Sequence, residues 1–276
     1  MSQRPKFRGL LEAGRRLFQR KPQRATSAEA LQLELSKFGT WLYPFELADG
    51  VTTPVQNDWF LEAHETRLRM MLPVLDKAFG ERWGEVTCLD AGCNEGYVGF
   101  EIARRGAKSV VGFDARAKNI EKAEFVKRHL GMKNISFRVD DITNLSKERY
   151  GSFHLTLFLG LLYHLEDLMG ALRRVRAVTR ELCVIDTQVL RDGPGVTTLS
   201  GMEEVEISDI VGIIEERGQQ SSPLASVTAL SMVPNTSALF TMLRRAGFAD
   251  VQQIMPYPDC YDRYASFDRV IVFARV

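Results

Sequence analysis

Apolar and polar positions follow a regular alternation in the second half of the chain. From Val86 onward, short apolar runs with few charges alternate with stretches that have helical spacing. The runs are VTCLD, SVVGFD, ISFRVD, FHLTLFLG and ELCVIDTQVL, and the helical stretches between them are 96–105, 116–130 and 165–178. Such runs are typical of strands buried on both faces, and their alternation with helices indicates a doubly wound α/β sheet.

The alternation breaks after the fifth apolar run. Residues 188–233 hold DGPG, an acidic stretch and QQSSP, which predicts an insertion after the fifth strand, where a lid over an acceptor site is well placed. A helix over 235–246, a strand over 250–255 and a closing strand in FDRVIVFARV follow. We expect one main domain, residues 85–276, that includes this insertion.

A helical N-terminal cap, residues 25–84, is expected before the main domain. Helical spacing predicts a long amphipathic helix over Leu61–Phe79 and a short helix that ends near Phe38. The residues between them, 39–60, are rich in aromatic and turn residues, which favours an ordered loop.

Residues 1–24 form a basic amphipathic leader. They carry eight Lys or Arg against Glu12, so the segment is +7 and the rest of the chain is −6. A helix of this kind is suited to lie on an anionic membrane surface, to bind RNA or to dock on a partner, and a solvated leader without a partner fits equally well. The net negative remainder is a poor electrostatic partner for nucleic acid.

Composition places the chain among globular proteins with one main domain. It has 276 residues, of which 45% are apolar and 26% charged. Its four cysteines form no CxxC pair and have no histidine at ligand spacing, so we expect neither disulfides nor a metal site. No run reaches membrane-spanning length and no signal-peptide core is present, which favours a cytoplasmic location.

A glycine-rich turn, LDAGCNEGYVG at residues 89–99, joins the first strand to the next helix. Glycines at Gly92 and Gly96 allow close approach of a ligand to the backbone, and Gly99 allows the helix to pack tightly on the sheet. Asn94 stands where a nicotinamide-binding fingerprint requires glycine, but Asn tolerates the left-handed conformation. A glycine turn alone also fits a sharp bend without any ligand.

Acidic residues at three successive strand ends strengthen the ligand interpretation. Asp90 ends the first strand, Asp114 the second and Asp140 the third. A carboxylate after the second strand is suited to accept hydrogen bonds from both ribose hydroxyls, and one after the third can accept from an adenine amino group. Each acid alone is typical of a helix N-cap, but three acids at the ends of successive strands favour a nucleotide-like ligand.

The motifs LDAGCNEG, VVGFDA, FRVDDITNL and FLGLLYHLED resemble those of class I S-adenosylmethionine-dependent methyltransferases. The resemblance implies a Rossmann-like seven-stranded sheet with an antiparallel last strand, and S-adenosylmethionine as cofactor. The resemblance also implies the cofactor contacts. Asp90, Gly92 and Gly96 hold the methionine end, and Asn94, where the first motif departs from the family, is a cofactor-binding candidate in the same turn. Asp114 with Ala115 holds the ribose, Asp140 and the backbone of Asp141 and Ile142 hold the adenine, and Leu159 and Gly160 pass beside the sulfonium. His154 departs from the family, which usually has an acid nearby, so we interpret it as structural.

A narrower resemblance is to the tRNA wobble-uridine carboxymethyltransferase group. It rests on WLYPFELADGVTT, GLLYHLED and SMVPNTSALFTMLRRAGF. Those enzymes use a carboxylated S-adenosylmethionine read by basic residues and a tyrosine. Tyr163 matches the tyrosine, but residues 40–51 contain no Lys or Arg to match the N-terminal lysine, so plain S-adenosylmethionine is the expected donor.

Methyl transfer requires an aligned acceptor and often a base within hydrogen-bond reach of it. YHLED supplies Tyr163, His164, Glu166 and Asp167. His164 is the first candidate because imidazole titrates near neutral pH; orienting a loop or capping a helix is the alternative role. Glu166 is the second candidate, or else an exposed acid favoured by the helix dipole.

Other residues are weaker candidates for the site. His64 fits a surface position better than the cofactor mouth. The aromatics Trp41, Tyr43, Phe45 and Trp59 are suited to roof the pocket or simply to pack the cap, and Tyr257, Tyr261 and Arg263 are candidates for the acceptor site. The acids of the insertion are more typical of a solvated face than of a site for a cationic group; they are Glu203, Glu204, Glu206 and Asp209.

These patterns predict a methyltransferase with a small-molecule acceptor: a sugar, a lipid-linked precursor or a secondary metabolite. The basic leader makes a membrane-associated acceptor one option. The first alternative is a tRNA wobble-base modifying enzyme whose leader contacts RNA. The second is a cofactor-binding subunit that scaffolds a partner without turnover.

Overall fold

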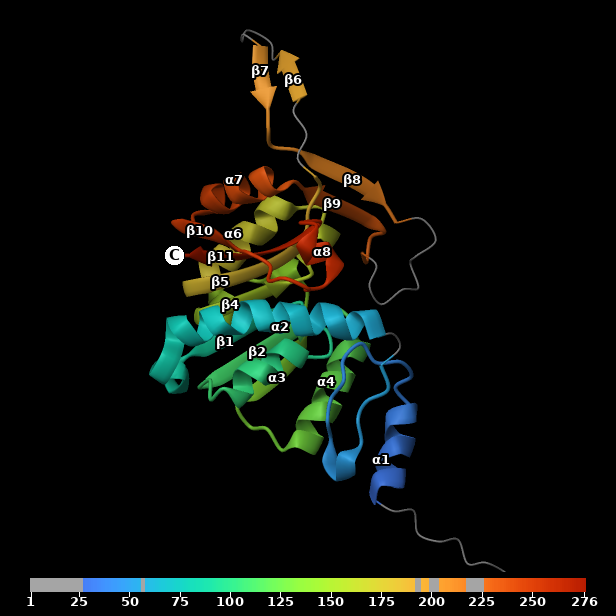
Figure 1. The fold of residues 1–276 in the computed structure, drawn as a ribbon. Coiled ribbons are helices and arrows are strands. Elements are labelled where there is room, and N and C mark those ends of the chain that lie inside the picture. Colours follow the sequence, from blue (N-terminus) through green and yellow to red (C-terminus); the bar gives the residue numbers. More distant parts are fainter. Residues whose placement is uncertain (1–26, 56–57, 192–194, 199–203, 217–225) are drawn as a thin grey trace, which may run out of the picture.

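The computed structural model describes the chain except for residues 1–26, 56–57, 192–194, 199–203 and 217–225. Within this part, seven strands form one mixed sheet in the order β10-β11-β5-β4-β1-β2-β3 (Figure 1). Their bounds are β1 Thr87–Ala91, β2 Ser109–Asp114, β3 Ile135–Val139, β4 Phe153–Leu159, β5 Thr179–Gln188, β10 Asp250–Ile254 and β11 Arg269–Arg275. The predicted basic leader lies outside the described residues.

Pairing within the sheet confirms the predicted Rossmann-like arrangement. The strands from β1 to β5 pair in parallel, and β11 runs antiparallel to both of its neighbours, β5 and β10. The sequence predicts all seven: β1 to β5 as short apolar runs with few charges, and β10 and β11 as the strands after the last helix. Parallel pairing brings the carboxyl ends of β1, β2 and β4 to the same edge of the sheet.

Helices cover both faces of the sheet and enclose two apolar cores. One face carries α2 Asp58–Phe79, α3 Tyr97–Arg104 and α4 Ala117–Leu130, and the other carries α6 Leu168–Val178 and α7 Thr236–Ala246 (Figure 1). The remaining α-helices of the described part are α1 Ser27–Ser36, α5 Lys147–Tyr150 and α8 Asp262–Ala265. This two-sided cover explains why the strands read as continuous apolar runs rather than alternating ones.

Side-chain caps fix the first residues of α6 and α7, which the hydrophobic pattern of the sequence places only approximately. The Asp167 side chain accepts from the backbone N–H of Gly170 at 2.7 Å, so α6 starts at Leu168 rather than at 165. The residues just before it, Leu162–His164, form a short 3-10 turn. Asn235 caps α7 in the same way, accepting from Ala238 N at 2.9 Å.

The insertion after β5 contains two β-hairpins that the sequence did not predict. β6 Gly195–Thr198 pairs with β7 Glu204–Ile207, and β8 Val211–Glu215 pairs with β9 Leu230–Pro234. The first hairpin extends away from the body, whereas β8 and β9 lie near the edge of the domain (Figure 1).

Two further observations concern the expected environment. None of the helices in the described ranges is long and apolar enough to cross a bilayer. The four cysteines, all within those ranges, are buried free thiols.

Candidate functional site

Two adjoining cavities lie at the carboxyl ends of β1, β2 and β4. The first has a volume of about 350 Å³ and the second of about 390 Å³. They share Gly92, Asp114, Arg116, Leu161 and His164, so these residues stand where the two meet. This is the edge of an α/β sheet where ligands bind.

The predicted cofactor residues divide between the two cavities. Ala115, Asp140, Asp141 and Ile142 line the first, and Asn94, Leu159 and Gly160 line the second. Gly92 and Asp114 line both. The structure therefore brings the residues of four separate motifs to one continuous site.

Packing explains the glycines of the turn. A Cβ at Gly92 would lie 2.7 Å from Leu161 Cδ2, and one at Gly96 would lie 2.6 Å from Phe137 Cζ. Both residues also have positive φ, as does Asn94 at 51°, which is the left-handed conformation that the sequence predicts for it. The glycines thus let neighbouring side chains close over the turn, and Gly92 in addition forms part of the cavity wall.

Asp114 is the best-oriented carboxylate at the junction of the cavities. Its two oxygens accept from the backbone N–H groups of Asn94 at 3.0 Å and Arg116 at 2.9 Å, and from the Asn119 side chain at 3.0 Å. Burial raises its pKa, although these hydrogen bonds oppose the shift. A carboxylate held in this way has its remaining lone pairs fixed in direction, which suits recognition of a pair of hydroxyl groups.

Asp140 has a different environment from Asp114. One oxygen accepts from Asp141 N and Asn144, and the other from Tyr150 and Arg149. Burial raises its pKa, but these hydrogen bonds outweigh burial and bring the pKa to about 2. The carboxylate is therefore charged and occupied by protein donors, so its main effect is to order the loop that lines the first cavity.

Asp90 lies behind the cavity wall rather than on it. It is 2% exposed and accepts from Gly99 N at 3.1 Å, which ties β1 to the first turn of α3. Burial raises its pKa to about 7, although the Gly99 N–H and the charge of Arg67 oppose the shift.

We expect Asp90→Asn to stabilise the free protein at neutral pH. The folded protein holds a proton on Asp90 up to about pH 7, whereas the unfolded chain loses it near pH 4, so wild-type stability falls across this window as pH rises. The amide has no charge to bury and still accepts from Gly99 N. Denaturant unfolding at pH 4, 6 and 8 should show an advantage of the variant that grows with pH; an advantage that is constant with pH would contradict the assignment.

The N-terminal cap is anchored to the glycine turn through Glu95. This fully buried carboxylate accepts from Leu42 N at 3.0 Å, from Tyr43 N at 3.3 Å and from Lys122 Nζ at 2.6 Å. Lys122 also donates to the carbonyl of Thr40. The cap thus places Tyr43 in the wall of the second cavity.

His64 corrects a sequence prediction. It was expected at the surface, but it lines the second cavity, with its ring 4.2 Å from that of Tyr43 between centroids. Burial, followed by the charges of Arg67 and Arg269, lowers its pKa well below the ordinary value. The amphipathic pattern of α2 does not indicate that the cap folds over this face, which is why the placement was wrong.

A buried charge cluster forms the floor of the second cavity. Asp186, fully buried in β5, pairs with Arg269 at 2.8 and 3.0 Å and with Arg67 at 2.5 Å. Burial raises the pKa of Asp186, but the two guanidinium groups outweigh it and lower the pKa overall. A Cβ at Gly160 would lie 3.1 Å from Arg269 Nη2, so the glycine makes room for this cluster.

The candidate bases occupy distinct positions. His164 lines both cavities, and Nδ1 of its ring lies 3.4 Å from Oε1 of Glu216. Tyr163 lines the second cavity, with the Arg269 guanidinium 5.6 Å above its ring. Glu166 is exposed and lines only the first cavity of the two. This geometry favours His164 over Glu166 as the base.

The remaining candidates separate into cavity residues and packing residues. Tyr261 and Arg263 line the second cavity, whereas Tyr257 packs under Arg69 and donates to Thr66. Trp41 and Phe45 are buried in the core, and the side chain of Trp59 lies outside the described part. Of the insertion acids, Asp209 accepts from Ser237 at 2.5 Å; Glu203 and the side chains of Glu204 and Glu206 are not described.

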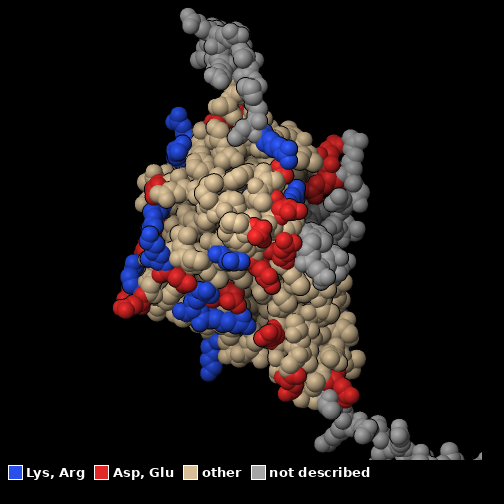
Figure 2. Space-filling view, viewed as in Figure 1, with Lys and Arg blue, Asp and Glu red and all other residues tan. Residues whose placement is uncertain are grey.

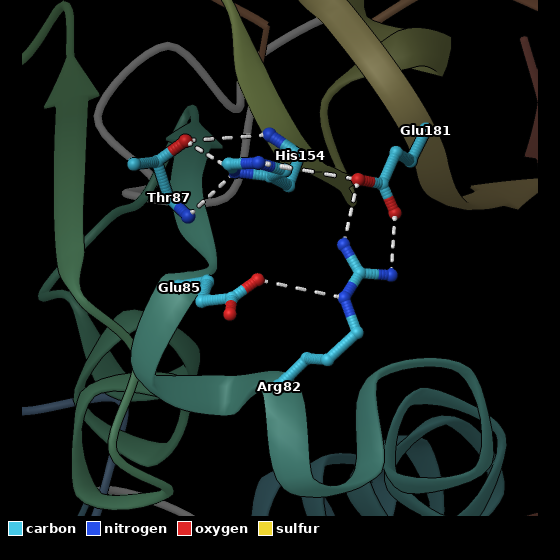
Figure 3. Close-up of polar contacts among 5 residues, drawn as sticks. All are labelled: Arg82, Glu85, Thr87, His154 and Glu181. Carbon is cyan, nitrogen blue, oxygen red and sulfur yellow. Dashed lines mark hydrogen bonds and ion pairs between the residues drawn. The ribbon is translucent and has the colours of Figure 1, made fainter.

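His154 is structural, as predicted. It lies at the start of β4, at the opposite end of the strands from the cavities, where its Nδ1 accepts from Thr87 N at 3.0 Å (Figure 3). Its Nε2 faces Glu181 at 3.9 Å, and Glu181 in turn pairs with Arg82 at 3.1 Å. The ring therefore joins the starts of β1, β4 and β5.

Sequence reasoning missed Glu216, Asp186 and the arginines that pair with Asp186. Asp186 carried a signal, because a single acid within the apolar run LCVIDTQV requires a buried partner. No local pattern identifies Arg67 and Arg269 as those partners, since they lie on distant elements.

Comparison with known proteins agrees with this geometry. Residues 84–206 match a family model described as a methyltransferase domain. The N-terminal domain of EvdMO1, solved in the presence of S-adenosylhomocysteine (SAH) and D-fucose, superimposes with a TM-score of 0.68 at 21% identity and covers 91% of this chain and 97% of that one. Magnesium protoporphyrin IX methyltransferase from Synechocystis PCC 6803 superimposes with a TM-score of 0.51 at 14% identity, covering 80% and 87%.

The matches among curated proteins belong to a different group from the solved structures above. A tRNA U34 carboxymethyltransferase of Trichodesmium erythraeum is 25% identical over 61% of this chain and 46% of its own length. That of Aliarcobacter butzleri is 23% identical over 76% and 58%. The chain thus spans about half the length of the curated relatives it matches.

Residues 84–206 thus match a methyltransferase domain, and the fold is the one that the sequence predicts from its resemblance to S-adenosylmethionine-dependent methyltransferases. The residues fit that cofactor: Asp114 presents a fixed carboxylate at the junction, and the first cavity has apolar walls from Phe113, Ile142 and Leu165. When bound, S-adenosylmethionine supplies an electrophilic methyl group on a sulfonium. What remains for a protein in such a reaction is to align the acceptor and, where a proton leaves it, to take up that proton.

Proposed function

We propose that this chain methylates a small-molecule acceptor that binds in the second cavity. The acceptor class is the one expected from the sequence: a sugar, a lipid-linked precursor or a secondary metabolite. In the same proposal, Asp114 holds the ribose, residues 140–142 border the adenine, and Leu159 and Gly160 flank the methyl group.

The observation that carries the proposal is the shape and lining of the second cavity. Its volume of about 390 Å³ suits a small ligand rather than a polymer, and it joins the cofactor cavity directly at Asp114 and His164. Polar side chains converge on it from the cap, α2, β11 and the insertion, among them Tyr43, Arg67, Arg269 and Glu216. Several orienting groups around one cavity are typical of a site for a polar small molecule.

Surface charge supports the same choice. Lys and Arg do not form a continuous basic surface among the described residues on the face in Figure 2, where Asp and Glu gather on the right half. The chain without residues 1–24 has a net charge of −6. Nucleic-acid binding depends largely on neutralising phosphates, so the body offers little for it. The neighbour solved in the presence of D-fucose is consistent with a sugar acceptor.

A second candidate is modification of the tRNA wobble uridine. The curated relatives favour it, since those matched are tRNA U34 carboxymethyltransferases. In this alternative the basic leader supplies the phosphate contacts that the body lacks. Deletion of residues 1–24 should then abolish RNA binding and transfer together.

Transfer of an isotope-labelled methyl group from S-adenosylmethionine into a fractionated cell extract tests the proposal. The fractions are tRNA, lipid and polar small molecules, and Asp114→Ala serves as the blank. Label in the lipid or small-molecule fraction is the expected result. Label confined to tRNA would favour the second candidate, and absence of label with retained cofactor binding would favour a scaffold without turnover.

A further inference from the structure

The His164 ring faces a carboxylate that comes from the insertion. Nδ1 of His164 lies 3.4 Å from Oε1 of Glu216, the residue that follows β8. The two side chains are 15% and 14% exposed, so water screens the contact only in part. Glu216 lines the second cavity together with His164.

Glu216 is itself held in place from the β9 side of the hairpin. Its Oε2 accepts from Ser226 N at 2.8 Å, and its Oε1 accepts from the Ser231 hydroxyl. The hydrogen bonds lower the pKa of Glu216 although burial raises it, so the carboxylate is charged at neutral pH. An oriented anion beside an imidazole stabilises the Nδ1–H tautomer and the protonated ring.

A second contact fixes the backbone at the same place. The Ser226 hydroxyl donates to the carbonyl of His164 at 2.9 Å. Together Glu216 and Ser226 hold both the ring and the main chain of His164, and both come from the insertion. The hairpin formed by β8 and β9 is therefore part of the site rather than only a cover over it.

We propose that Glu216 is a positioning residue that makes His164 the proton acceptor of methyl transfer. The Glu216 carboxylate, at ion-pair distance from Nδ1, favours a proton on that nitrogen, and Nε2 then keeps a free lone pair. As an acceptor hydroxyl oxygen bonds to the methyl carbon and the sulfur–methyl bond breaks, the hydroxyl proton passes to Nε2. The products are the methyl ether, SAH and an imidazolium that Glu216 stabilises. This inference rests on the proposed function.

Other charged groups near His164 shift its pKa in the direction opposite to that of Glu216. Arg116, at the start of α4, and Arg269, on β11, lower the pKa of His164, and burial lowers it most. Tyr163 packs on the ring at 4.0 Å between centroids, and Glu166 and Asp167 line the first cavity beside it. Glu216 is thus the group that opposes the lowering of the His164 pKa by burial and by the two arginines.

NMR titration of the His164 ring tests this contact without cofactor or acceptor. The chain has four histidines, and His164→Gln identifies the resonance. We expect Glu216→Gln to move the His164 midpoint to lower pH, because the amide removes the charge that raises its pKa. Glu215→Gln, at the exposed preceding position on β8, is the matched control and should leave the midpoint unchanged. An unchanged midpoint in Glu216→Gln overturns the proposal.

The pH profile of methyl transfer tests the role. Glu216→Gln should reduce kcat/KM by about 10- to 100-fold and move its acid limb to lower pH. A merely structural role would lower the rate equally at every pH and leave the limb in place, which would overturn the proposal. If the wild-type protein transfers methyl groups to no acceptor, that result counts against the proposed function. The NMR titration would still show whether Glu216 raises the pKa of His164.

Discussion

Replacement of Asp114 by alanine should weaken SAH binding by about 100- to 10,000-fold. Two hydrogen bonds to a charged carboxylate contribute about 1.5–3 kcal/mol each, and 1.4 kcal/mol corresponds to a factor of ten. The loss should be large because Asp114 stands at the junction of both cavities and its oxygens are oriented by Asn94, Arg116 and Asn119.

Isothermal titration calorimetry measures this effect directly. Asp114→Asn, which keeps the size of the side chain, should show a smaller loss, and Asp250→Ala, half-exposed on β10, should bind as wild type. Unfolding curves establish that each variant is folded. Affinity of Asp114→Ala within about threefold of wild type would refute the assignment of the ribose site.

Replacement of Asp186 by alanine should cost about 3–5 kcal/mol of unfolding free energy, because it leaves Arg67 and Arg269 buried without their counter-charge. The guanidinium groups are 8% and 11% exposed, so water compensates little. Chemical denaturation of the free protein provides the measurement. Asp186→Asn, which keeps an acceptor but no charge, should fall between the alanine variant and wild type.

Glu181→Gln is the matched control for this prediction. Glu181 lies on the same strand, at the other end, and pairs with Arg82, which is 49% exposed (Figure 3). Exposed ion pairs contribute little, so the unfolding midpoint should barely move. If the Asp186 and Glu181 substitutions lowered the unfolding free energy equally, burial of the Asp186 cluster would not be what determines its contribution to stability.

The sheet and the strand-end acids could be predicted because their signals are local. Each parallel strand is a short apolar run with few charges, and Asp114 ends one of them. Parallel pairing of these strands then places their carboxyl ends at one edge of the sheet. The Asn94 conformation is likewise determined within the turn itself.

The hairpins of the insertion and the Glu216 contact depend on distant partners instead. β8 pairs with β9 although the two are separated by residues 216–229, and β8 is largely exposed, so no apolar alternation marks it. His64 was misplaced for a related reason, since its exposure depends on its contact with Tyr43, a residue of the same cap that lies outside α2. Non-local contacts of this kind leave no periodic pattern.

The anchoring of the cap by Glu95 and Lys122 has a consequence for protein engineering. The cap meets the main domain through backbone N–H groups that need a buried carboxylate from the glycine turn. Glu95 and Lys122 both belong to the main domain and stay paired when the cap is exchanged. A chimaera with a cap from another protein must therefore supply equivalents of the Leu42 and Tyr43 N–H groups and of the Thr40 carbonyl, or leave this buried pair short of hydrogen-bond partners.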